Sequence, residues 1–530
     1  MTVSGNLAGW MLERFAAPGM AGRVALRQGD RQLTYAELSA MVGRISDVLR
    51  GLGLQRGERV ALFMRDTMEA AASILGIMHA GGVAVPLSEL MTAADVKRYL
   101  MHCGAAIAIV EARLEPLIDE VRVELPMLRE ILCVGLGDQP ANERGERDYF
   151  SAVARATSGA AAIPCGPTDA AMLLYSAGFA AEDLRAVPHS RTTVEAAFDS
   201  CARGLFGLTE ADCVLSVGRL TTAYGLGSGL LFPLLAGAQV VLFPDQPKSE
   251  ALFRIIHDMK PTVLFATPSI YSQLTFDSAM AGPKPLAQLR LAVAGAEGMP
   301  EHLIPKIRTV LGTEVVVGYG LTELFQFALA GRSDDRGNRA GVCGRPLPGV
   351  TARVVDDDGD PVELNEIGTL QLAAGSMFAG YWPASQTSGD IGPDGWFTTH
   401  DRFLVDGNGD HHHCGRVDDL FKVGGKWVSP VEVERALTAH DAVWECAVIG
   451  SEDEEGLIKP LAFVVTNVGQ QGGPALEAEL QEYVKTVLAP YKYPRWIDFV
   501  DALPRGPGGK ILRYKLKPQR RRRRAETGHG

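Results

Sequence analysis

Apolar residues fall into short runs that alternate with longer segments of helical spacing through most of the chain. The short runs predict buried strands at residues 59–64, 106–110, 172–175, 239–243, 263–265 and 291–294. Helical spacing predicts helices over 34–52 and 67–80, and Thr34 stands three residues before Glu37, a capping-box pattern that marks a helix start. Buried strands that alternate with helices indicate an α/β protein with parallel sheets covered by helices.

Two stretches interrupt this alternation. Residues 137–167 and 373–394 lack periodicity, so we expect irregular segments there, the first running over the surface. Beyond them the pattern becomes that of a small α+β unit. We therefore expect a large N-terminal domain over residues 1–416, a small mobile C-terminal domain over 417–517, and a hinge near Asp418.

Length and composition narrow the function class. A chain of 530 residues is too long for one compact core, and its net charge of -11 argues against a general nucleic-acid binder. The eight cysteines lack paired short spacings, which suits a reducing cytoplasm and no structural zinc. We find no signal peptide and no stretch of ~20 apolar residues, so we expect a cytoplasmic protein without a membrane partner. The arginine run at 520–524 repels itself, which predicts a disordered tail over 518–530.

The segment 319–323, Tyr-Gly-Leu-Thr-Glu, follows a predicted strand and brings a hydroxyl and a carboxylate to one turn. The hydroxyl of Thr322 can bond a phosphate oxygen, and Glu323 can hold Mg²⁺, a cation that prefers oxygen ligands. A plain helix N-terminus with Thr322 near its cap is the alternative.

Three further segments carry side chains that a nucleotide needs. A Trp-Phe-Thr-Thr-His-Asp segment ends in Asp401, which we expect on a strand end, where it can grip two ribose hydroxyls. Residues 415–419 supply the cation of Arg416 and the pivot Asp418. Near the C-terminus a glycine-rich loop presents Lys510, which can neutralise charge on a carboxylate that attacks an α-phosphate.

These segments, in this order over residues 33–517, resemble those of the acyl-adenylate-forming (AMP-binding) superfamily. The resemblance implies an acyl-CoA synthetase-like fold, with a large domain of parallel and mixed sheets covered by helices and a small α+β domain that turns about Asp418. It implies nucleotide-binding roles for Gly295, Ala296, Glu297, Tyr319, Thr322, Asp401 and Arg416. It implies catalytic roles for Lys510, Thr322, Glu323 and Asp418, and a pantetheine tunnel beside Gly424 and Gly425.

The segment that begins Arg-Leu-Thr-Thr before Ala223 resembles the acyl pocket of benzoate–CoA ligases. By this resemblance, Ala223, Tyr224 and Gly225 form a flat slot for one aromatic ring, with Leu321 and Gln326 at its edge. The alternative is that Tyr224 is an ordinary core residue. Substituents on the ring are not legible in the sequence.

The phosphate-binding loop departs from the family pattern. Members carry a loop rich in serine, threonine and glycine that ends in Pro-Lys-Gly, whereas residues 175–186 here are Tyr-Ser-Ala-Gly-Phe-Ala-Ala-Glu-Asp-Leu-Arg-Ala. Ser176 and Gly178 remain, Leu184 stands at the lysine position, and Arg185 follows it. Loss of about three hydrogen bonds at ~1.5–3 kcal/mol each would weaken the grip on pyrophosphate by ~4–9 kcal/mol. A loop that has drifted without consequence is the alternative.

The altered loop concerns pyrophosphate, whereas the residues expected to bind AMP, the acyl ring and the pantetheine thiol remain. This difference leads to the hypothesis of an aryl transferase, which moves an aromatic acyl group from its CoA thioester to the phosphopantetheine thiol of an acyl carrier protein without ATP. Such an enzyme most resembles the anthraniloyl-CoA anthraniloyltransferase type. The transfer requires no cofactor, although bound AMP can carry the acyl group. One alternative is an ATP-dependent aromatic acid–CoA ligase with Mg²⁺ at Glu323, which Lys510 favours. Another is a non-catalytic aroyl-CoA binder, which the hinge residues Arg416 and Asp418 disfavour. The acid, the acceptor thiol, the oligomeric state and the role of the tail stay open.

The run 411–414, His-His-His-Cys, invites a metal hypothesis. Adjacent residues on an extended segment point to opposite faces, so at most His411 and His413 could share a metal. A structural strand explains the run better. We also expect His189 and His400 to be local hydrogen-bonding residues rather than catalysts.

Overall fold

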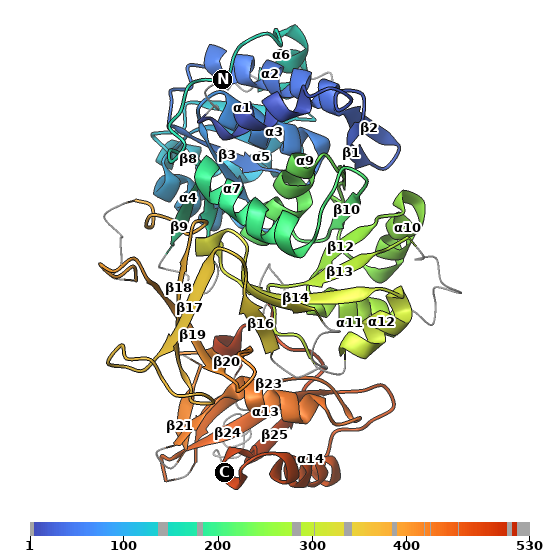
Figure 1. Cartoon of the computed structure of the whole chain (residues 1–530), viewed down its shortest axis with the longest axis vertical. Helices are drawn as coiled ribbons and strands as arrows, with labels where there is room; N and C mark the ends of the chain where they lie inside the picture. The colour runs from blue at the N-terminus through green and yellow to red at the C-terminus, as the bar shows by residue number, and fades with distance from the viewer. Residues whose placement is uncertain are drawn as a thin grey trace, which may run out of the picture.

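The computed structural model describes α/β layers followed by a separate C-terminal unit (Figure 1). The described residues are 5–135, 147–176, 184–277, 288–300, 303–332, 342–383, 390–417, 419–423, 426–453, 455–505 and 511–516. Four expected functional residues, Asp418, Gly424, Gly425 and Lys510, lie outside this description. Residues 177–183 of the phosphate loop and the predicted tail over 518–530 lie outside it as well.

A seven-stranded sheet forms the N-terminal layer, in the order β7-β6-β5-β3-β4-β8-β9. Its strands are β3 (Arg59–Phe63), β4 (Val83–Leu87), β5 (Ala105–Glu111), β6 (Glu130–Val134), β7 (Arg147–Asp148), β8 (Ala170–Tyr175) and β9 (Ala186–Ser190). All neighbours pair in parallel except β8 and β9, which are antiparallel and are joined by the phosphate-loop segment. The helices of this part are α1 (Leu7–Phe15), α2 (Tyr35–Gly51), α3 (Met68–His79), α4 (Ala93–Cys103), α5 (Glu115–Asp119) and α6 (Tyr149–Arg155).

A thirteen-stranded sheet forms the second layer, in the order β17-β18-β19-β20-β16-β15-β14-β13-β12-β10-β11-β1-β2. Its strands are β1 (Val24–Gln28), β2 (Arg31–Thr34), β10 (Cys213–Ser216), β11 (Gln239–Val241), β12 (Val263–Ala266), β13 (Leu291–Ala294), β14 (Glu314–Gly320), β15 (Phe327–Arg332), β16 (Val342–Pro346), β17 (Val350–Val355), β18 (Gly368–Ala374), β19 (Phe397–Val405) and β20 (His411–Arg416). The pairs from β1 through β11, β10, β12 and β13 to β14 are parallel, and the pairs beyond β14 are antiparallel. The carboxyl ends of β12, β13 and β14 therefore lie side by side, where ligands commonly bind in such sheets.

Helix α3 lies between the two layers, since it contacts β3 and β4 of the first sheet and β1 of the second. All its residues are buried, in keeping with its mostly apolar composition, and its buried Glu69 forms an ion pair with Arg31. The remaining helices of this region are α7 (Arg191–Ala197), α8 (Ala223–Leu226), α9 (Phe232–Ala236), α10 (Ser249–Met259), α11 (Pro268–Asp277) and α12 (Leu303–Leu311). Two π-helical segments, η3 (Phe198–Leu205) and η4 (Gly227–Leu231), continue from α7 and α8. Short 3₁₀ turns are η1 (Ala112–Leu114), η2 (Arg122–Glu124), η6 (Thr322–Leu324), η8 (Pro490–Lys492) and η9 (Arg513–Lys515).

The C-terminal unit, at the red end of the chain in Figure 1, has its own core of apolar residues from its sheet and helices. It consists of β21 (Phe421–Val423), β22 (Lys426–Val428), α13 (Pro430–Thr438), β23 (Val443–Glu452), β24 (Ile458–Thr466), α14 (Pro474–Val487) and β25 (Trp496–Phe499). Strand β24 pairs with β23 antiparallel and with β25 in parallel, which makes a small mixed sheet. The architecture confirms the predicted fold class, a large α/β part followed by a small α+β part.

The predicted strands and helices are confirmed to within a few residues. Thr34 caps α2 as expected, because its side chain accepts from the backbone N–H of Glu37 while the Glu37 carboxylate accepts from the N–H of Thr34. Two predictions need correction. The stretch 137–167, expected to be irregular, contains β7 and helix α6, and Asp401 lies in the middle of β19 rather than at a strand end.

Helix α6 forms because Asp148 caps it, accepting from the backbone N–H of Ser151, and because Tyr149 and Val153 point inward one turn apart. Tyr149 is fully buried, and its hydroxyl lies 3.0 Å from that of Ser73 in α3. The polar composition around this short helix hid it from the sequence pattern.

Within the described residues, no helix is long and apolar enough to cross a bilayer. The same residues contain no group of three or more His, Cys, Asp or Glu side chains that could hold a metal ion. The histidine run forms β20, which confirms the structural strand expected there.

Candidate active site

The turn after β13 carries the Gly-Ala-Glu segment expected beside the nucleotide base. Ala296 has a φ of +69°, a left-handed conformation that costs a non-glycine residue free energy and is often found at functional sites. One carboxylate oxygen of Glu297 accepts hydrogen bonds from the N–H and hydroxyl of Ser269, at 3.1 and 2.5 Å, and so caps the start of α11. Its other oxygen, Oε1, is buried and has no hydrogen-bond partner in the described part of the chain, so it can accept from a ligand.

Asp401 is the buried charge of the site, with 7% of its surface exposed. The Tyr319 hydroxyl donates to its Oδ2 at 2.7 Å, and Nε2 of His413 lies 3.1 Å from its Oδ1. Arg416 is its direct partner across the β19–β20 ladder. The structure therefore brings together Tyr319, Asp401 and Arg416, three of the residues expected to hold the nucleotide.

The pKa of Asp401 reflects this surrounding. Burial alone would raise it, but the hydrogen bonds from His413 and Tyr319 and the charge of Arg416 lower the pKa to about 2. The carboxylate therefore remains charged over the physiological range and can accept from ribose hydroxyls. Burial, and after it the neighbouring Asp401 carboxylate, raises the pKa of the Tyr319 hydroxyl, so this hydroxyl stays protonated and donates.

The turn that carries Thr322 and Glu323 is the short 3₁₀ helix η6, held from two sides. Nε2 of His189 donates to the carbonyl of Thr322 at 2.8 Å, and the N–H of Phe378 donates to the carbonyl of Glu323 at 2.8 Å. Burial lowers the pKa of His189 to about 3, so the ring is neutral and Nε2 carries its proton. His189 is thus a local hydrogen-bonding residue, as expected.

Glu323 is 3% exposed, and its Oε1 accepts from the Tyr381 hydroxyl at 2.9 Å. A single carboxylate at the expected phosphate site fits Mg²⁺, which usually takes one or two protein carboxylates and completes its shell with phosphate oxygens and water. The residue present is therefore compatible with the metal. Tyr381 would orient the carboxylate by the hydrogen bond seen here.

The segment of the expected aromatic slot forms the short helix α8. Thr222 caps it by accepting from the N–H of Gly225 at 3.0 Å. The hydroxyl of Tyr224 donates to the carbonyls of Val293 and Ala266, at 3.1 and 3.3 Å, so this side chain is tied to the ends of β13 and β12. Tyr224 therefore stands at the edge of the sheet where the nucleotide turn begins.

Gln326 connects this segment to the Thr-Glu turn. It is 3% exposed, and its Nε2 donates to the carbonyls of Ala223 and Tyr224 at 3.2 and 3.0 Å. Beside it, the ring of Phe327 stacks on Tyr224 with centroids 5.8 Å apart. A Cβ on Gly295 would lie 2.5 Å from the Phe327 ring and 3.2 Å from that of Tyr224, so the turn expected beside the base and the segment expected to hold the aromatic ring are in contact.

The phosphate side begins where β9 starts. Arg185, next to the position expected for the family's lysine, forms an ion pair with Asp390 at 3.0 Å, and both side chains are only 18% exposed. Its guanidinium also lies 5.2 Å from the centre of the Tyr381 ring. The guanidinium of Arg185 is thus paired with a carboxylate and packed on the tyrosine that binds Glu323.

Sequence reasoning missed three side chains of this site, namely His413, Tyr381 and Phe327. The β19–β20 register shifts between Arg402 and Phe403, next to the residues that face Asp401, and Gly415, with a φ of +109°, is the sequence signal of that irregularity. Tyr381 and Phe327 stood in segments without a polar signature. Leu321, expected at the edge of the aromatic slot, packs against the core that includes Phe378 and Tyr381.

The small C-terminal unit contacts this site. Nη1 of Arg505 lies 3.4 Å from the hydroxyl of Ser269, the partner of Glu297. Nη2 of Arg435, in α13, donates to the carbonyl of His413 at 2.8 Å. The unit thus lies against both the base-side turn and β20.

A large α/β part, a small unit docked on it, and a buried Asp–Tyr–Arg cluster beside a Gly-Ala-Glu turn are features of acyl-adenylate-forming enzymes. The chain belongs to the AMP-binding enzyme family: the family profile matches residues 12–382, and that of the AMP-binding enzyme C-terminal domain matches residues 432–510.

Relatives and solved structures resemble the chain over nearly its whole length. It is 34% identical to the benzoate–CoA ligase of Thauera aromatica, which covers 97% of this chain and 95% of the relative. It is 35% identical to the 4-hydroxybenzoate–CoA/benzoate–CoA ligase of Rhodopseudomonas palustris, over 97% of this chain and 94% of the relative. The structure of the anthranilate CoA ligase AuaEII in complex with anthranoyl-AMP superposes with a TM-score of 0.90 at 32% identity, covering 97% of both chains. A benzoate CoA ligase from Burkholderia xenovorans LB400 gives a TM-score of 0.87 at 31% identity, over 97% of this chain and 100% of that one.

Proposed function

We propose that this chain converts a benzoate-type aromatic acid to its CoA thioester through an aroyl-AMP intermediate, as an ATP-dependent aromatic acid–CoA ligase of the cytoplasm. The observation that carries the proposal is the close approach of the Gly295 turn, after β13, to the rings of Phe327 and Tyr224, together with the hydrogen bond from Tyr319, in β14, to Asp401. The cluster around Asp401 suits a nucleotide, and the segment around Tyr224 suits an aromatic ring. The named activities of the relatives, which act on benzoate, hydroxybenzoate and anthranilate, support the same substrate class.

The chemistry has two steps. In the first, a carboxylate oxygen of the acid attacks the α-phosphorus of ATP and pyrophosphate leaves; in the second, a thiolate attacks the acyl carbon and AMP leaves. We assign the ribose to Asp401 and Arg416, the α-phosphate to Thr322, and the charge of the first step to Lys510. Mg²⁺ held by Glu323 would supply a positive charge to the phosphates.

The small domain would serve the second step. We propose that residues 417–517 turn about Asp418 and bring Gly424 and Gly425 to the pantetheine arm. The buried ring slot would hold the aroyl group in place during that rotation. Asp418, Gly424 and Gly425 lie outside the described part of the chain, so their roles rest on the family resemblance.

A second candidate function is supported by the phosphate side of the site. The loop lacks most of the family's hydroxyls and its lysine, and Arg185 is paired with Asp390. These features favour an aryl transferase that takes the acyl group from aroyl-CoA and delivers it to the phosphopantetheine thiol of an acyl carrier protein. Exchange of one thioester for another is nearly balanced in free energy, so this reaction needs no ATP.

ATP–pyrophosphate exchange separates the two candidates. The ligase predicts exchange that depends on benzoate, anthranilate or a hydroxybenzoate, and AMP release that matches thioester formation. The transferase predicts no exchange and instead predicts movement of radiolabel from aroyl-CoA to a phosphopantetheinylated carrier protein without ATP. A weakened loop costing ~4–9 kcal/mol would slow exchange by roughly 10³- to 10⁶-fold.

An internal variant sharpens the test. Asp390→Asn releases the charge of Arg185 without changing the size of the side chain, so exchange should increase if Arg185 can serve the phosphates. Tight binding of aroyl-CoA with neither exchange nor transfer would contradict both candidates and identify a non-catalytic binder.

A further inference from the structure

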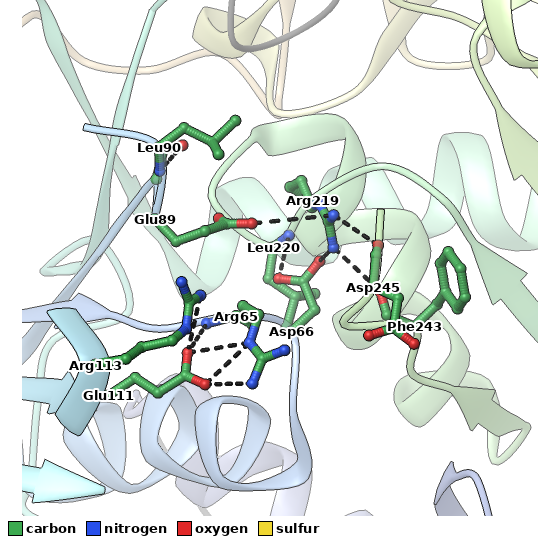
Figure 2. A network of polar contacts seen from close by, with 11 residues as sticks. Arg65, Asp66, Glu89, Leu90, Glu111, Arg113, Arg219, Leu220, Phe243 and Asp245 are labelled. Carbon is green, nitrogen blue, oxygen red and sulfur yellow. Dashed lines mark hydrogen bonds and ion pairs between the residues drawn. The ribbon is translucent and has the colours of Figure 1, made fainter. Parts of the chain in front are cut away.

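The loop that leads into the aromatic slot is held by one arginine that contacts three separate segments (Figure 2). Nη1 of Arg219 donates to the carbonyl of Phe243 at 3.1 Å, and Nη2 donates to the carbonyl of Asp245 at 2.8 Å. The same guanidinium lies 3.5 Å from Oδ2 of Asp66 and 4.0 Å from Oε1 of Glu89. Asp66 follows β3, Glu89 follows β4, and the two carbonyls follow β11, so a single side chain ties the two sheets together.

The backbone of Arg219 supports the slot directly. Its carbonyl accepts from the N–H and the hydroxyl of Thr222, at 3.0 and 2.9 Å, and Thr222 is the residue that caps α8. A Cβ on Gly225 would lie 2.0 Å from the same carbonyl, so the helix that carries Tyr224 is built against Arg219. On the other side, the N–H of Leu220 donates to Oδ1 of Asp66 at 3.2 Å.

We propose that Arg219 is a positioning residue for the aromatic acyl group, and that its ion pair with Asp66 makes acyl binding depend on pH. The inference rests on the proposed use of the Tyr224 segment as an aromatic slot. Arg219 does not contact the slot through its own side chain. It acts by fixing the loop from which α8 starts.

The pH dependence follows from the burial of Asp66. The pKa of Asp66 is raised to about 6. Burial is the largest cause and the nearby Glu89 adds to it, while Arg219 and the Leu220 N–H act in the opposite direction. Above that pH the carboxylate is charged and the ion pair with Arg219 is complete. As the pH falls through about 6, Asp66 takes up a proton and the ion pair is lost, so the hold on the loop weakens.

The other charges near this pair have partners of their own. Figure 2 shows Arg65, adjacent to Asp66, turned toward Glu111, with its Nε 2.9 Å from the Glu111 carboxylate. Arg113 lies 3.3 Å from the same carboxylate. Arg65 also interacts with the charges of Asp245 and Glu89, so it is linked to the group around Asp66 through Glu89. The charged groups that act on Asp66 directly are Arg219 and Glu89.

Direct binding tests the proposal without requiring turnover. Two probes are titrated by calorimetry, a benzoylsulfamoyl adenosine that mimics benzoyl-AMP, and AMP alone. Arg219→Met, which keeps the apolar stem, should weaken binding of the benzoyl probe by about tenfold or more at about pH 7.5 and leave AMP binding unchanged. Arg219→Lys should recover part of the loss. Arg254→Met, at an exposed pair with Glu250, is the matched control and should change neither.

Asp66→Asn isolates the pH effect because it is isosteric and has no proton to lose. Wild-type protein should bind the benzoyl probe more weakly at about pH 5.5 than at about pH 7.5, and Asp66→Asn should bind it equally at both. Equal weakening of both probes by Arg219→Met, or no weakening, would overturn the positioning role, and a wild-type pH profile in Asp66→Asn would overturn the pH dependence. Failure of wild-type protein to bind the benzoyl probe would instead contradict the proposed function.

Discussion

Among the described residues, the side chains of Tyr319 and His413 donate hydrogen bonds to the carboxylate of Asp401, and the donor His413 was not predicted from the sequence. The imidazole lies 3.1 Å from the carboxylate and is nearly parallel to the ring of Tyr319, the other donor. Both donors fix the orientation of the Asp401 carboxylate, so His413 would belong to the nucleotide side of the site if Asp401 receives the ribose hydroxyls, as proposed. Within the histidine run of β20, His413 therefore contacts Asp401, whereas its neighbour His412 contacts Asp406 in a nearby turn.

His413→Phe should weaken AMP binding. The substitution keeps an aromatic ring beside Tyr319 but removes one hydrogen bond to a charged group, worth ~1.5–3 kcal/mol, so the dissociation constant for AMP should rise by roughly tenfold or more. Calorimetric titration measures this. His412→Phe is the control, since that ring binds Asp406 in a neighbouring turn and should leave AMP affinity unchanged. Equal effects of the two variants would contradict a specific role for His413.

Gly225→Ala should disrupt the slot. The new Cβ would meet the Arg219 carbonyl at 2.0 Å, and a backbone atom cannot move aside as a flexible side chain can. We expect a loss of ~1–3 kcal/mol of stability from this overpacking, seen in urea unfolding, together with weaker binding of aromatic acids. Gly298→Ala is the control, because no atom lies within 4 Å of the position of its Cβ. A variant Gly225→Ala as stable as the control would show that the loop can shift without cost.

At the scale of elements, caps and periodicity explain what could be predicted. Strands β3, β5, β8, β11, β12 and β13 are largely continuous apolar runs, and α2 and α3 have clear start signals, so the sequence was sufficient for them. Helix α6 was missed because it is a short helix with few inward residues. Asp401 was placed at a strand end because β19 continues through alternating polar residues that resemble a loop.

Thr34→Ala should destabilise the protein through α2. The change removes the side-chain half of the capping box and should lower the free energy of unfolding by ~1 kcal/mol. Thr34→Ser retains the acceptor oxygen and should restore most of that stability. Chemical denaturation of the three proteins checks this, and equal stability of all three would mean that packing alone sets the start of the helix.

The candidate site was predictable only in part. Residues within short motifs, such as Tyr319, Thr322 and Asp401, were found through their resemblance to a family. The contacts that orient them come from segments far away in sequence, as Tyr381 does for Glu323, and depend on sheet register and loop course. No periodicity records such contacts, because each is made by a single side chain that crosses between elements.

At the scale of the whole molecule, the small unit contacts the large part through polar groups, among them Arg505 at the Ser269 hydroxyl and Arg435 at the His413 carbonyl. Arg435→Met should loosen this attachment, because it removes the hydrogen bond from α13 to the His413 carbonyl. Hydrogen exchange of the α13 amides should become faster, while that of β3 to β5 stays unchanged. Arg495→Met is the control, since that side chain packs on Tyr493 within the small unit. Unchanged exchange in α13 would mean that other contacts are sufficient to hold it.

The hydrogen bonds of Gln326 have a consequence for how the proposed function would discriminate between acids of different size. One amide group clips the carbonyls of Ala223 and Tyr224, and the same residue stands only three positions after Glu323. If the Tyr224 segment holds the aromatic ring and Glu323 serves the phosphates, as proposed, a ring too wide for that segment would push α8 outward and, through Gln326, shift the turn that carries Glu323. Under the proposed function, acid size and phosphate chemistry would then be coupled, and an ill-fitting acid would be rejected by misalignment of the reaction as well as by steric exclusion.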